Sequence, residues 1–412
     1  MHRTNRFWLP TYCAPDGLLP KVQETRTLFS KRPYAFPDFV GRAISFLQSK
    51  EVKAAGFEFC PDKALPCKWR CADESLFGVD LALYAQTGHY PFDKGRLGGG
   101  FNEMALGAAV HHGPINIDFG GSHVGYTPGE NGGSFGRIWR PQNGAPSSNC
   151  GYLTSFMAGF RSVYDDAIKN ILVYQSPGGQ VFVNVPNEYV QPNWSSLAIK
   201  LMVDTDTFTN GEVDYEPVSA HTHCPIGRTL FHLSDTFLDG LTHEDRERLT
   251  TADPTPIGRL LSPKFFNIFD VEADIDSHGL PKQRLLPYMK YILAASHAPP
   301  LLKAAIINTN IEHNRLTDLT RAEEYDPYGF ASFSGVFIDL FDDVSGRYGV
   351  LFQPLAIAIK PAGRLRETEF LPEEIHDRFH KIKPAKPAIP LEDVLRSSSF
   401  DSWTDAYTFK VE

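Results

Sequence analysis

The first half of the chain alternates short apolar segments with helical patterns and glycine-rich turns. A strand is predicted over residues 64–71, between helices predicted over 38–56 and 74–87. Gly56 can end the first helix, because glycine readily adopts the left-handed conformation that often follows a helix. Further strand-like segments lie at 115–119, 135–139, 170–174 and 181–185, and a helix is expected over 152–168. This alternation predicts an α/β core whose ligands gather at the carboxyl ends of its strands.

The pattern changes after about residue 215. Residues 283–309 are predicted to be largely helical, with a break at two prolines. Two long apolar segments, 330–342 and 348–359, resemble an antiparallel hairpin. Prolines and aromatic residues are frequent in residues 1–40, and prolines with mixed charges follow Lys360. The predicted parts are therefore an N-terminal arm (1–45), an α/β domain (46–215), a second α+β region (216–360) and an extended tail (361–412).

Charge and cysteine content limit the partners and the compartment. The 412 residues include 40 Lys and Arg against 49 Asp and Glu, a net charge of −9, so neither nucleic acid nor a membrane surface is expected as a partner. Six scattered cysteines are too few for a disulfide-dense secreted scaffold, which favours a reducing compartment. Residues 1–10 lack a signal-peptide core, so we expect a cytoplasmic protein, although a cleaved transit peptide would leave no trace here.

Three residues in the first half could form a metal site. Cys71 lies at the end of the predicted strand, His123 is bracketed by glycines, and Cys150 precedes another glycine. They are too far apart in sequence for a zinc finger, so they can meet only in a folded core. Two thiolates and one imidazole would leave the fourth zinc position to water or substrate, which is the arrangement of a catalytic site.

These residues belong to a longer series of landmarks. In order they are CADE at 71–74, RLGG at 96–99, GAAVHH at 107–112, GSHVG at 121–125, RPQ at 140–142 and CG at 150–151. The series resembles the limiting-CO2-inducible protein B/C type of β-carbonic anhydrase over about residues 56–153. The resemblance implies a β-carbonic-anhydrase-like core with a central, mostly parallel sheet flanked by helices, joined here to an additional α+β C-terminal region.

The resemblance also implies an activity and a site. Zn²⁺ would be bound by Cys71, His123 and Cys150, and Asp73 would accept a hydrogen bond from the zinc-bound water. The reaction would be the reversible hydration of CO2 to bicarbonate by zinc-bound hydroxide, in a homodimer. Three further residues could supply polar contacts around the metal or in the substrate pocket: His112, Arg96 and Gln142.

The sequence departs from the family pattern in one place. Active members pair the aspartate with an arginine a few residues further on, but residues 74–78 contain none. Without that arginine Asp73 could rotate into the fourth zinc position, unless Arg70, Arg96 or Arg140 substitutes. A catalytically silent zinc-binding scaffold, or a hydrolase of a CO2 analogue such as carbonyl sulfide, is therefore an alternative. A metal-free hydrolase with a cysteine nucleophile is a third possibility.

Other motifs have simpler explanations. Cys67 points into the predicted sheet and is expected to be a packing residue. The segment 221–224 (HTHC) is a rival metal candidate, but a surface loop is the more frequent role of such a segment. The glycine-rich turn at 95–100 lacks the Lys-Ser/Thr of a phosphate-binding loop and is expected to be a tight turn.

Overall fold

The computed structural model describes eleven segments of the chain and divides it into two compact units. The segments are 33–127, 134–140, 144–190, 197–201, 227–233, 235–270, 284–294, 299–342, 347–364, 368–370 and 372–386. Within the described residues, the first unit runs to Thr154 and resumes at Ala304, and the second comprises Ser155–Lys303. The second unit is thus inserted into the sequence of the first.

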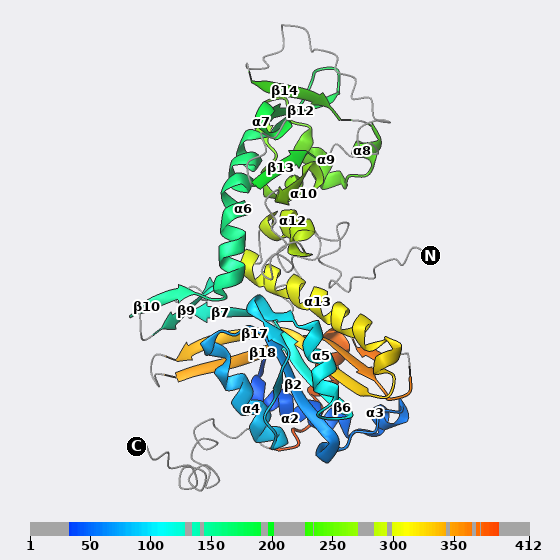
Figure 1. Cartoon of the computed structure of the whole chain (residues 1–412). Coiled ribbons are helices and arrows are strands. Elements are labelled where there is room, and N and C mark those ends of the chain that lie inside the picture. Colours follow the sequence, from blue (N-terminus) through cyan, green and yellow to red (C-terminus); the bar gives the residue numbers. More distant parts are fainter. Residues whose placement is uncertain are drawn as a thin grey trace. The chain divides into compact units, whose positions relative to one another are not determined.

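The first unit contains a sheet whose centre is parallel (Figure 1). Its strands are ordered β1-β18-β17-β6-β2-β3. The strands β17, β6, β2 and β3 run parallel to one another, whereas β18 is antiparallel to β17 and β1 is antiparallel to β18. The bounds are β1 Tyr34–Ala35, β18 Arg347–Lys360, β17 Gly329–Asp342, β6 Ile115–Gly121, β2 Ala64–Arg70 and β3 Phe92–Asp93. The predicted α/β fold class with a central, mostly parallel sheet flanked by helices is confirmed.

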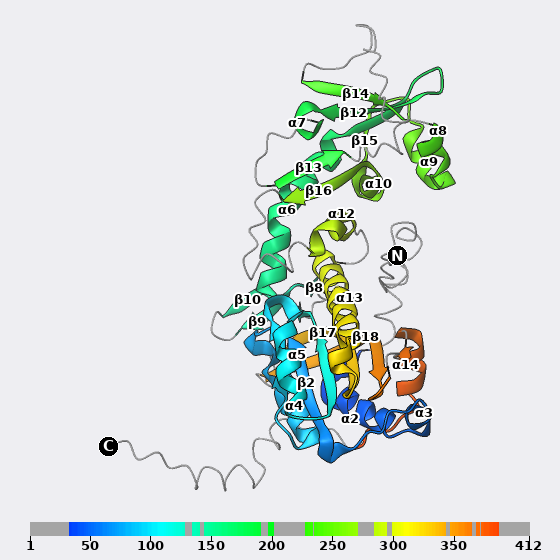
Figure 2. The ribbon, with the colours of Figure 1, turned by 45° about the vertical axis from the view of Figure 1, so that its right-hand side comes forward.

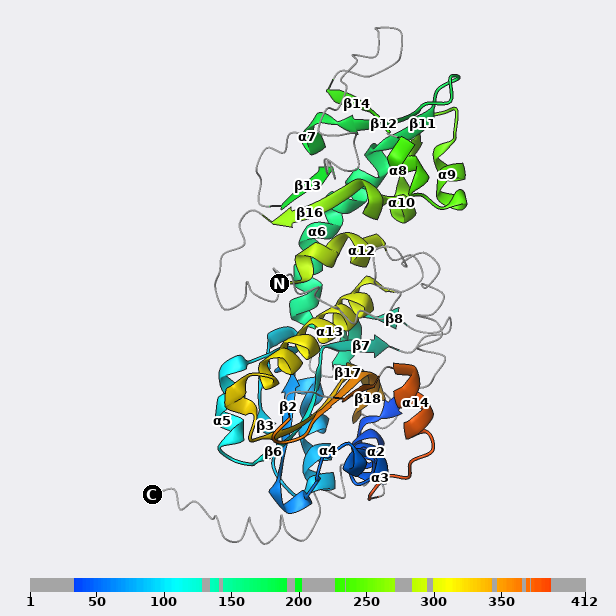
Figure 3. The same cartoon turned by 90° about the vertical axis from the view of Figure 1, so that its right-hand side faces the viewer.

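Helices cover both faces of this sheet (Figure 3). On one face lie α2 (Phe36–Leu47), α3 (Lys50–Ala54), α4 (Phe77–Thr87) and α14 (Pro372–Phe379), and on the other lie α5 (Glu103–Val110) and the part of α13 (Pro300–Thr320) that belongs to this unit. Phe36 and Phe39 of α2 are fully buried against aromatic side chains of the sheet, including Phe119. On the opposite face Trp69 packs with Leu106 of α5 and Leu316 of α13.

The smaller elements of this unit lie at the edges of the sheet or in its loops. They are η3 Pro61–Lys63, η4 Glu74–Leu76, β4 Gly95–Arg96, η5 Leu97–Gly99, β5 Gly100–Phe101, β7 His123–Thr127, β8 Ser134–Phe135, β9 Arg137–Arg140, β10 Ala145–Ser148, η9 Glu323–Tyr325 and β19 Thr368–Phe370. Of these, β7 pairs parallel with the second half of β17, and β9 pairs with β10.

The unit boundaries differ from those expected from the sequence. The hairpin β17–β18 falls in the second region that the sequence predicts over 216–360, but β17 pairs with β6 from Gly329 to Ser334 and forms the middle of the first sheet. Residues 36–47 form a buried helix rather than part of an arm, and residues 1–32 lie outside the described residues. Local patterns show where a strand runs, but its partner is determined by contacts between distant segments.

The expected extended tail contains folded structure up to residue 386. It includes β19, which pairs with β18, and α14, whose Ile375 and Phe379 are fully buried. Residues 387–412 lie outside the described residues. β19 and α14 therefore belong to the core of the first unit.

The substitution Phe379→Ala tests this assignment. The Phe379 ring stacks on Phe39 at 5.1 Å between centroids and contacts Phe46 at 5.4 Å, so truncation is expected to lower the free energy of unfolding by about 3–5 kcal/mol. Phe77→Ala, which truncates a ring that is 57% exposed, is the control and should change it by less than about 0.5 kcal/mol. Equal effects in urea denaturation would show that α14 does not contribute to the core.

The second unit is an α+β assembly of antiparallel strands and short helices (Figure 2). One sheet has the order β14-β12-β11-β15, and β13 pairs separately with β16. The bounds are α6 Gly151–Asn170, which begins in the first unit, β11 Leu172–Gln175, β12 Val181–Pro186, α7 Asn187–Val190, β13 Leu197–Leu201, β14 Arg228–His232, α8 Asp235–Asp239, α9 His243–Leu249, β15 Thr255–Pro256, α10 Gly258–Phe265, β16 Phe266–Asp270, η8 Leu286–Tyr288 and α12 Met289–Ala294. Within the described segments of both units, no helix has the length and apolarity needed to cross a bilayer.

Candidate metal centre

Cys71, His123 and Cys150 converge in the first unit. Their ligand atoms all lie within 4.8 Å of one another, and the two sulfur atoms are 3.9 Å apart. Each of the three side chains is at most 3% exposed. Residues that are distant in the sequence therefore form one buried group of metal-binding type.

The sheet explains how two of these residues meet. In the parallel pair β2 and β6, Arg70 lies opposite Gly121, so Cys71 and His123 follow at the same carboxyl edge. Gly121 has a φ of +147°, and a Cβ at this position would lie 1.7 Å from the carbonyl oxygen of Gly335. Glycine is required here because the end of β6 approaches β17 too closely for any side chain.

Asp339 of β17 orients the ring of His123. Nδ1 of His123 lies 2.6 Å from Oδ2 of Asp339, and both side chains are fully buried. Nε2 has no hydrogen-bond partner among the described residues. Burial by itself would lower the pKa of His123, but the carboxylate of Asp339 raises it well above its ordinary value. When Nδ1–H donates to Asp339, the lone pair on Nε2 is available to a metal ion.

The pKa values of the two neighbouring cysteines are shifted in opposite directions. The hydrogen bond from Cys150 lowers the pKa of Cys71 to about 4, against the effect of burial, and raises the pKa of Cys150. The backbone N–H of Gly98 also donates to Sγ of Cys71, at 3.2 Å. Both cysteines must be deprotonated to bind a divalent ion, so metal binding would displace the proton that lies between the two sulfurs.

The side chain of Arg70 holds the backbone of Cys71. Nη1 of Arg70 donates to the carbonyl oxygen of Cys71 at 2.6 Å, and Nη2 of Arg70 donates to Asp80 of α4 at 2.9 Å.

Two sulfurs and one imidazole nitrogen are a donor set that suits zinc. The residues present therefore fit a zinc ion with three protein ligands.

Asp73 lies beside this group and is not a member of it. Its Oδ1 accepts hydrogen bonds from the backbone N–H of Ser75 at 3.1 Å and from the Ser75 hydroxyl at 2.8 Å. Nη2 of Arg140, from β9, lies 3.2 Å from both carboxylate oxygens of Asp73. Burial would raise the pKa of Asp73, but His123, Ser75 and Arg140 together lower it. Arg140 therefore supplies the positive charge that residues 74–78 lack, and it also pairs with Glu74.

Of the other expected residues, His112 and Arg96 make their contacts elsewhere in the first unit. His112 is exposed at the end of α5, with its ring 5.4 Å from Phe92, because the helix ends there at the surface. Nη2 of Arg96 donates to Asn102 at 2.9 Å. Gln142 and the segment 221–224 lie outside the described residues.

Two contributors were missed by the sequence analysis. Asp339 is the one carboxylate within the apolar run 335–341. An acidic residue inside an apolar strand is expected to be buried with a hydrogen-bond or charge partner, so its position could have indicated this role. Ser75 gives no such signal, because a serine two residues after an aspartate is equally typical of a helix start.

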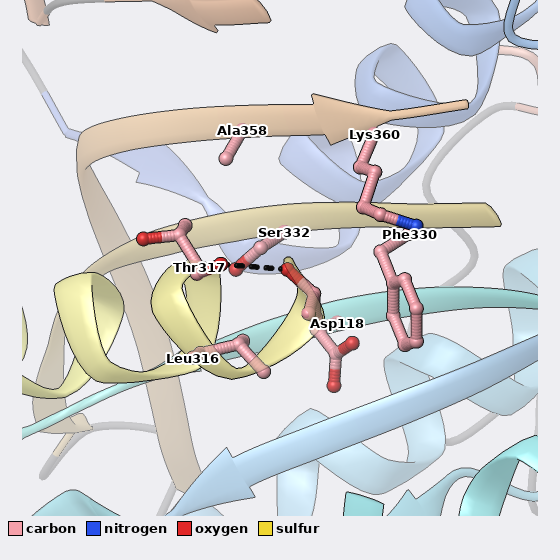
Figure 4. Close-up of a pocket in the computed structure, with 8 residues that line it drawn as sticks. Asp118, Leu316, Thr317, Phe330, Ser332, Ala358 and Lys360 are labelled. Atoms are coloured by element: carbon pink, nitrogen blue, oxygen red, sulfur yellow. Dashed lines mark hydrogen bonds between the residues drawn. The ribbon is translucent and has the colours of Figure 1, made fainter. Parts of the chain in front are cut away.

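A small cavity lies elsewhere in the first unit, between α13 and the strands β6, β17 and β18 (Figure 4). Its wall is made by Asp118, Leu316, Thr317, Thr320, Phe330, Ser332, Ala358 and Lys360. Asp118 forms a fully buried ion pair with Lys94 at 2.9 Å. None of the three metal-ligand candidates lines this cavity.

The fold and the site together define an α/β protein with a buried Cys-His-Cys group of metal-binding type. No protein-family model matches the sequence, and no curated protein matches it. Among solved structures, the chain is similar to PtLCIB4, a homolog of the limiting CO2-inducible protein LCIB, with 12% identity and a TM-score of 0.42 over 80% of this chain and 93% of that chain. It is also similar to the limiting CO2-inducible protein LCIB itself, with 14% identity and a TM-score of 0.39 over 82% of this chain and 93% of that chain.

Both structures carry the name of the family that the sequence landmarks resemble. At these identities and TM-scores the likeness transfers no residue role to this chain. The geometry of the site must therefore support any function proposed for it.

Proposed function

We propose that this chain binds one zinc ion through Cys71, His123 and Cys150 and catalyses the reversible hydration of CO2 to bicarbonate. The observation that carries the proposal is a three-ligand group with a separately held carboxylate, Asp73, beside it. Three protein ligands are typical of catalytic zinc sites, whereas structural sites have four. Zinc in such a site lowers the pKa of water to about 7 and so supplies hydroxide near neutrality.

The chain's own residues orient the reactants. Asp73 is ionised at neutral pH because its pKa is lowered, so its carboxylate can only accept hydrogen bonds. Oδ1 contacts the backbone N–H and the hydroxyl of Ser75 and also Arg140, whereas Oδ2 receives only Arg140 among the described residues. Oδ2 therefore has capacity for one more donor, and it is the oxygen that we assign to orienting the nucleophile's proton.

Metal analysis and CO2 hydration kinetics test this function together. The purified protein is expected to contain about one zinc per chain, as a single three-ligand site requires. It should also accelerate CO2 hydration in stopped-flow measurements, and His112→Ala, an exposed substitution away from the site, should leave both results unchanged. Stoichiometric zinc without acceleration would favour the silent scaffold, and absence of zinc would contradict the metal site. The homodimer and the cytoplasmic location are further predictions from the sequence.

A further inference from the structure

Ser75 lies between the two carboxylates of the site. Its hydroxyl oxygen is 2.7 Å from Oδ2 of Asp339 and 2.8 Å from Oδ1 of Asp73. Nδ2 of Asn149, next to Cys150 in the sequence, donates to the same oxygen at 3.1 Å. The Ser75 side chain is 2% exposed, so these three protein groups surround it in place of water.

A count of hydrogens shows what this hydroxyl can do. It has one hydrogen, which can be donated to Asp339 or to Asp73 but not to both at once. In either arrangement the other carboxylate keeps a donor, since Asp339 has Nδ1–H of His123 and Asp73 has the backbone N–H of Ser75. The hydroxyl therefore supports one carboxylate at a time and can switch between the two, while Nδ2 of Asn149 donates to its oxygen.

We propose that Ser75 is a positioning residue that joins Asp339, which holds the metal ligand His123, to Asp73, which orients the nucleophile. The role of Asp73 rests on the proposed function. Oδ1 of Asp339 has no hydrogen-bond partner within the described segments, so His123 and Ser75 are the donors that fix its carboxylate. Loss of the hydroxyl frees Asp339 to turn with the imidazole, and it leaves Asp73 without one of its donors.

Three variants separate this role from a purely structural one. Asp339→Asn is expected to weaken zinc binding, and Asp73→Asn to slow CO2 hydration with little change in zinc affinity. Ser75→Ala should both weaken zinc binding and slow CO2 hydration. Its zinc affinity, measured by competition with a chromophoric chelator, should fall about 10-fold to 100-fold, which is the usual effect of removing a group that supports a metal ligand. Its hydration rate at saturating zinc should fall as well.

The double variant Ser75→Ala with Asp339→Asn tests whether Ser75 acts through Asp339. Its loss of zinc affinity should be smaller than the product of the two single losses, because residues in one hydrogen-bond network are not additive. The absorption spectrum of the Co²⁺-substituted protein should also change in Ser75→Ala, as it reports the ligand geometry directly. Additive losses and an unchanged spectrum would overturn the proposal.

Ser332→Ala is the matched control. Ser332 is also buried in the first unit and lines the small cavity (Figure 4), to which none of the three metal-ligand candidates belongs. Its hydroxyl lies 3.3 Å from that of Ser334. Its removal should leave zinc affinity within about twofold of the wild type, as for independent sites. If Ser75→Ala does not fold, Ser75→Thr takes its place; it keeps the hydroxyl and should bind zinc within about threefold of the wild type, and a larger loss would overturn the proposal.

The outcomes distinguish this inference from the proposed function. A wild-type protein that binds no zinc would contradict the function. A wild-type protein that binds zinc and hydrates CO2, with Ser75→Ala equal to it in zinc affinity, would leave the function standing and overturn the role of Ser75.

Discussion

Cys71→Ser is expected to abolish stoichiometric zinc binding and, with it, CO2 hydration. A serine hydroxyl is not deprotonated at neutral pH, so the substitution removes the thiolate that burial would otherwise disfavour and that Cys150, His123 and Gly98 stabilise. Two ligands would be left, and the loss of affinity should exceed the roughly 100-fold upper effect of a supporting residue. Zinc per chain after equilibrium dialysis measures the result.

Thermal unfolding gives a second measurement of the same substitution. A ligand that binds only the native state stabilises it by about 2.7 kcal/mol at a concentration 100 times its Kd. Added zinc should therefore raise the Tm of the wild type and not that of Cys71→Ser. Cys60→Ser is the control, because Cys60 is a free cysteine outside the metal group. If Cys71→Ser retains one tightly bound zinc per chain, the ligand assignment is wrong.

The fold was predictable where the signal is local. The strand expected at 64–71 is β2, Ala64–Arg70, and the residues that alternate along it specify both its extent and the position of Cys71 just beyond it. The hairpin at 330–359 was also predicted, but its place in the molecule was not. Its pairing with β6 joins segments about 200 residues apart. Nothing in the composition of either segment specifies that partner.

The same limit applies within the site. Glycines around His123 indicate a close approach of strands, which the structure shows at Gly121. Arg140 was one of three arginines that could partner Asp73, and the choice among them depends on where β9 crosses the loop after β2. Asp339 could not be assigned to His123 from sequence, since the hairpin predicts that β17 pairs with β18 but gives no sign of its pairing with β6 and β7. Residues that act as ligands are thus more predictable than the residues that orient them.

Arg140→Gln is expected to lower the CO2 hydration rate about 10-fold to 100-fold while zinc content stays unchanged. Arg140 contacts both oxygens of Asp73 and none of the three ligand side chains within the described residues, so its loss should affect orientation and charge rather than metal binding. Arg140 is also one of the groups that lower the pKa of Asp73. Without it that pKa rises towards the ordinary value, so activity should be lost at a higher pH as the solution is acidified.

A pH–rate profile separates this electrostatic effect from a general loss of structure. Once Asp73 is protonated, the oxygen that carries the proton cannot accept a hydrogen bond from the nucleophile. The acidic limb of the profile therefore reports the ionisation of this carboxylate. Arg137→Gln is the matched control on the same strand, because Arg137 is exposed and contacts only the carbonyl oxygen of Pro146 among the side-chain interactions described for β9. An acidic limb that does not move in Arg140→Gln, with an unchanged rate, would mean that Asp73 is held without Arg140. The orientation of Asp73 would then depend on the two hydrogen bonds from Ser75 alone.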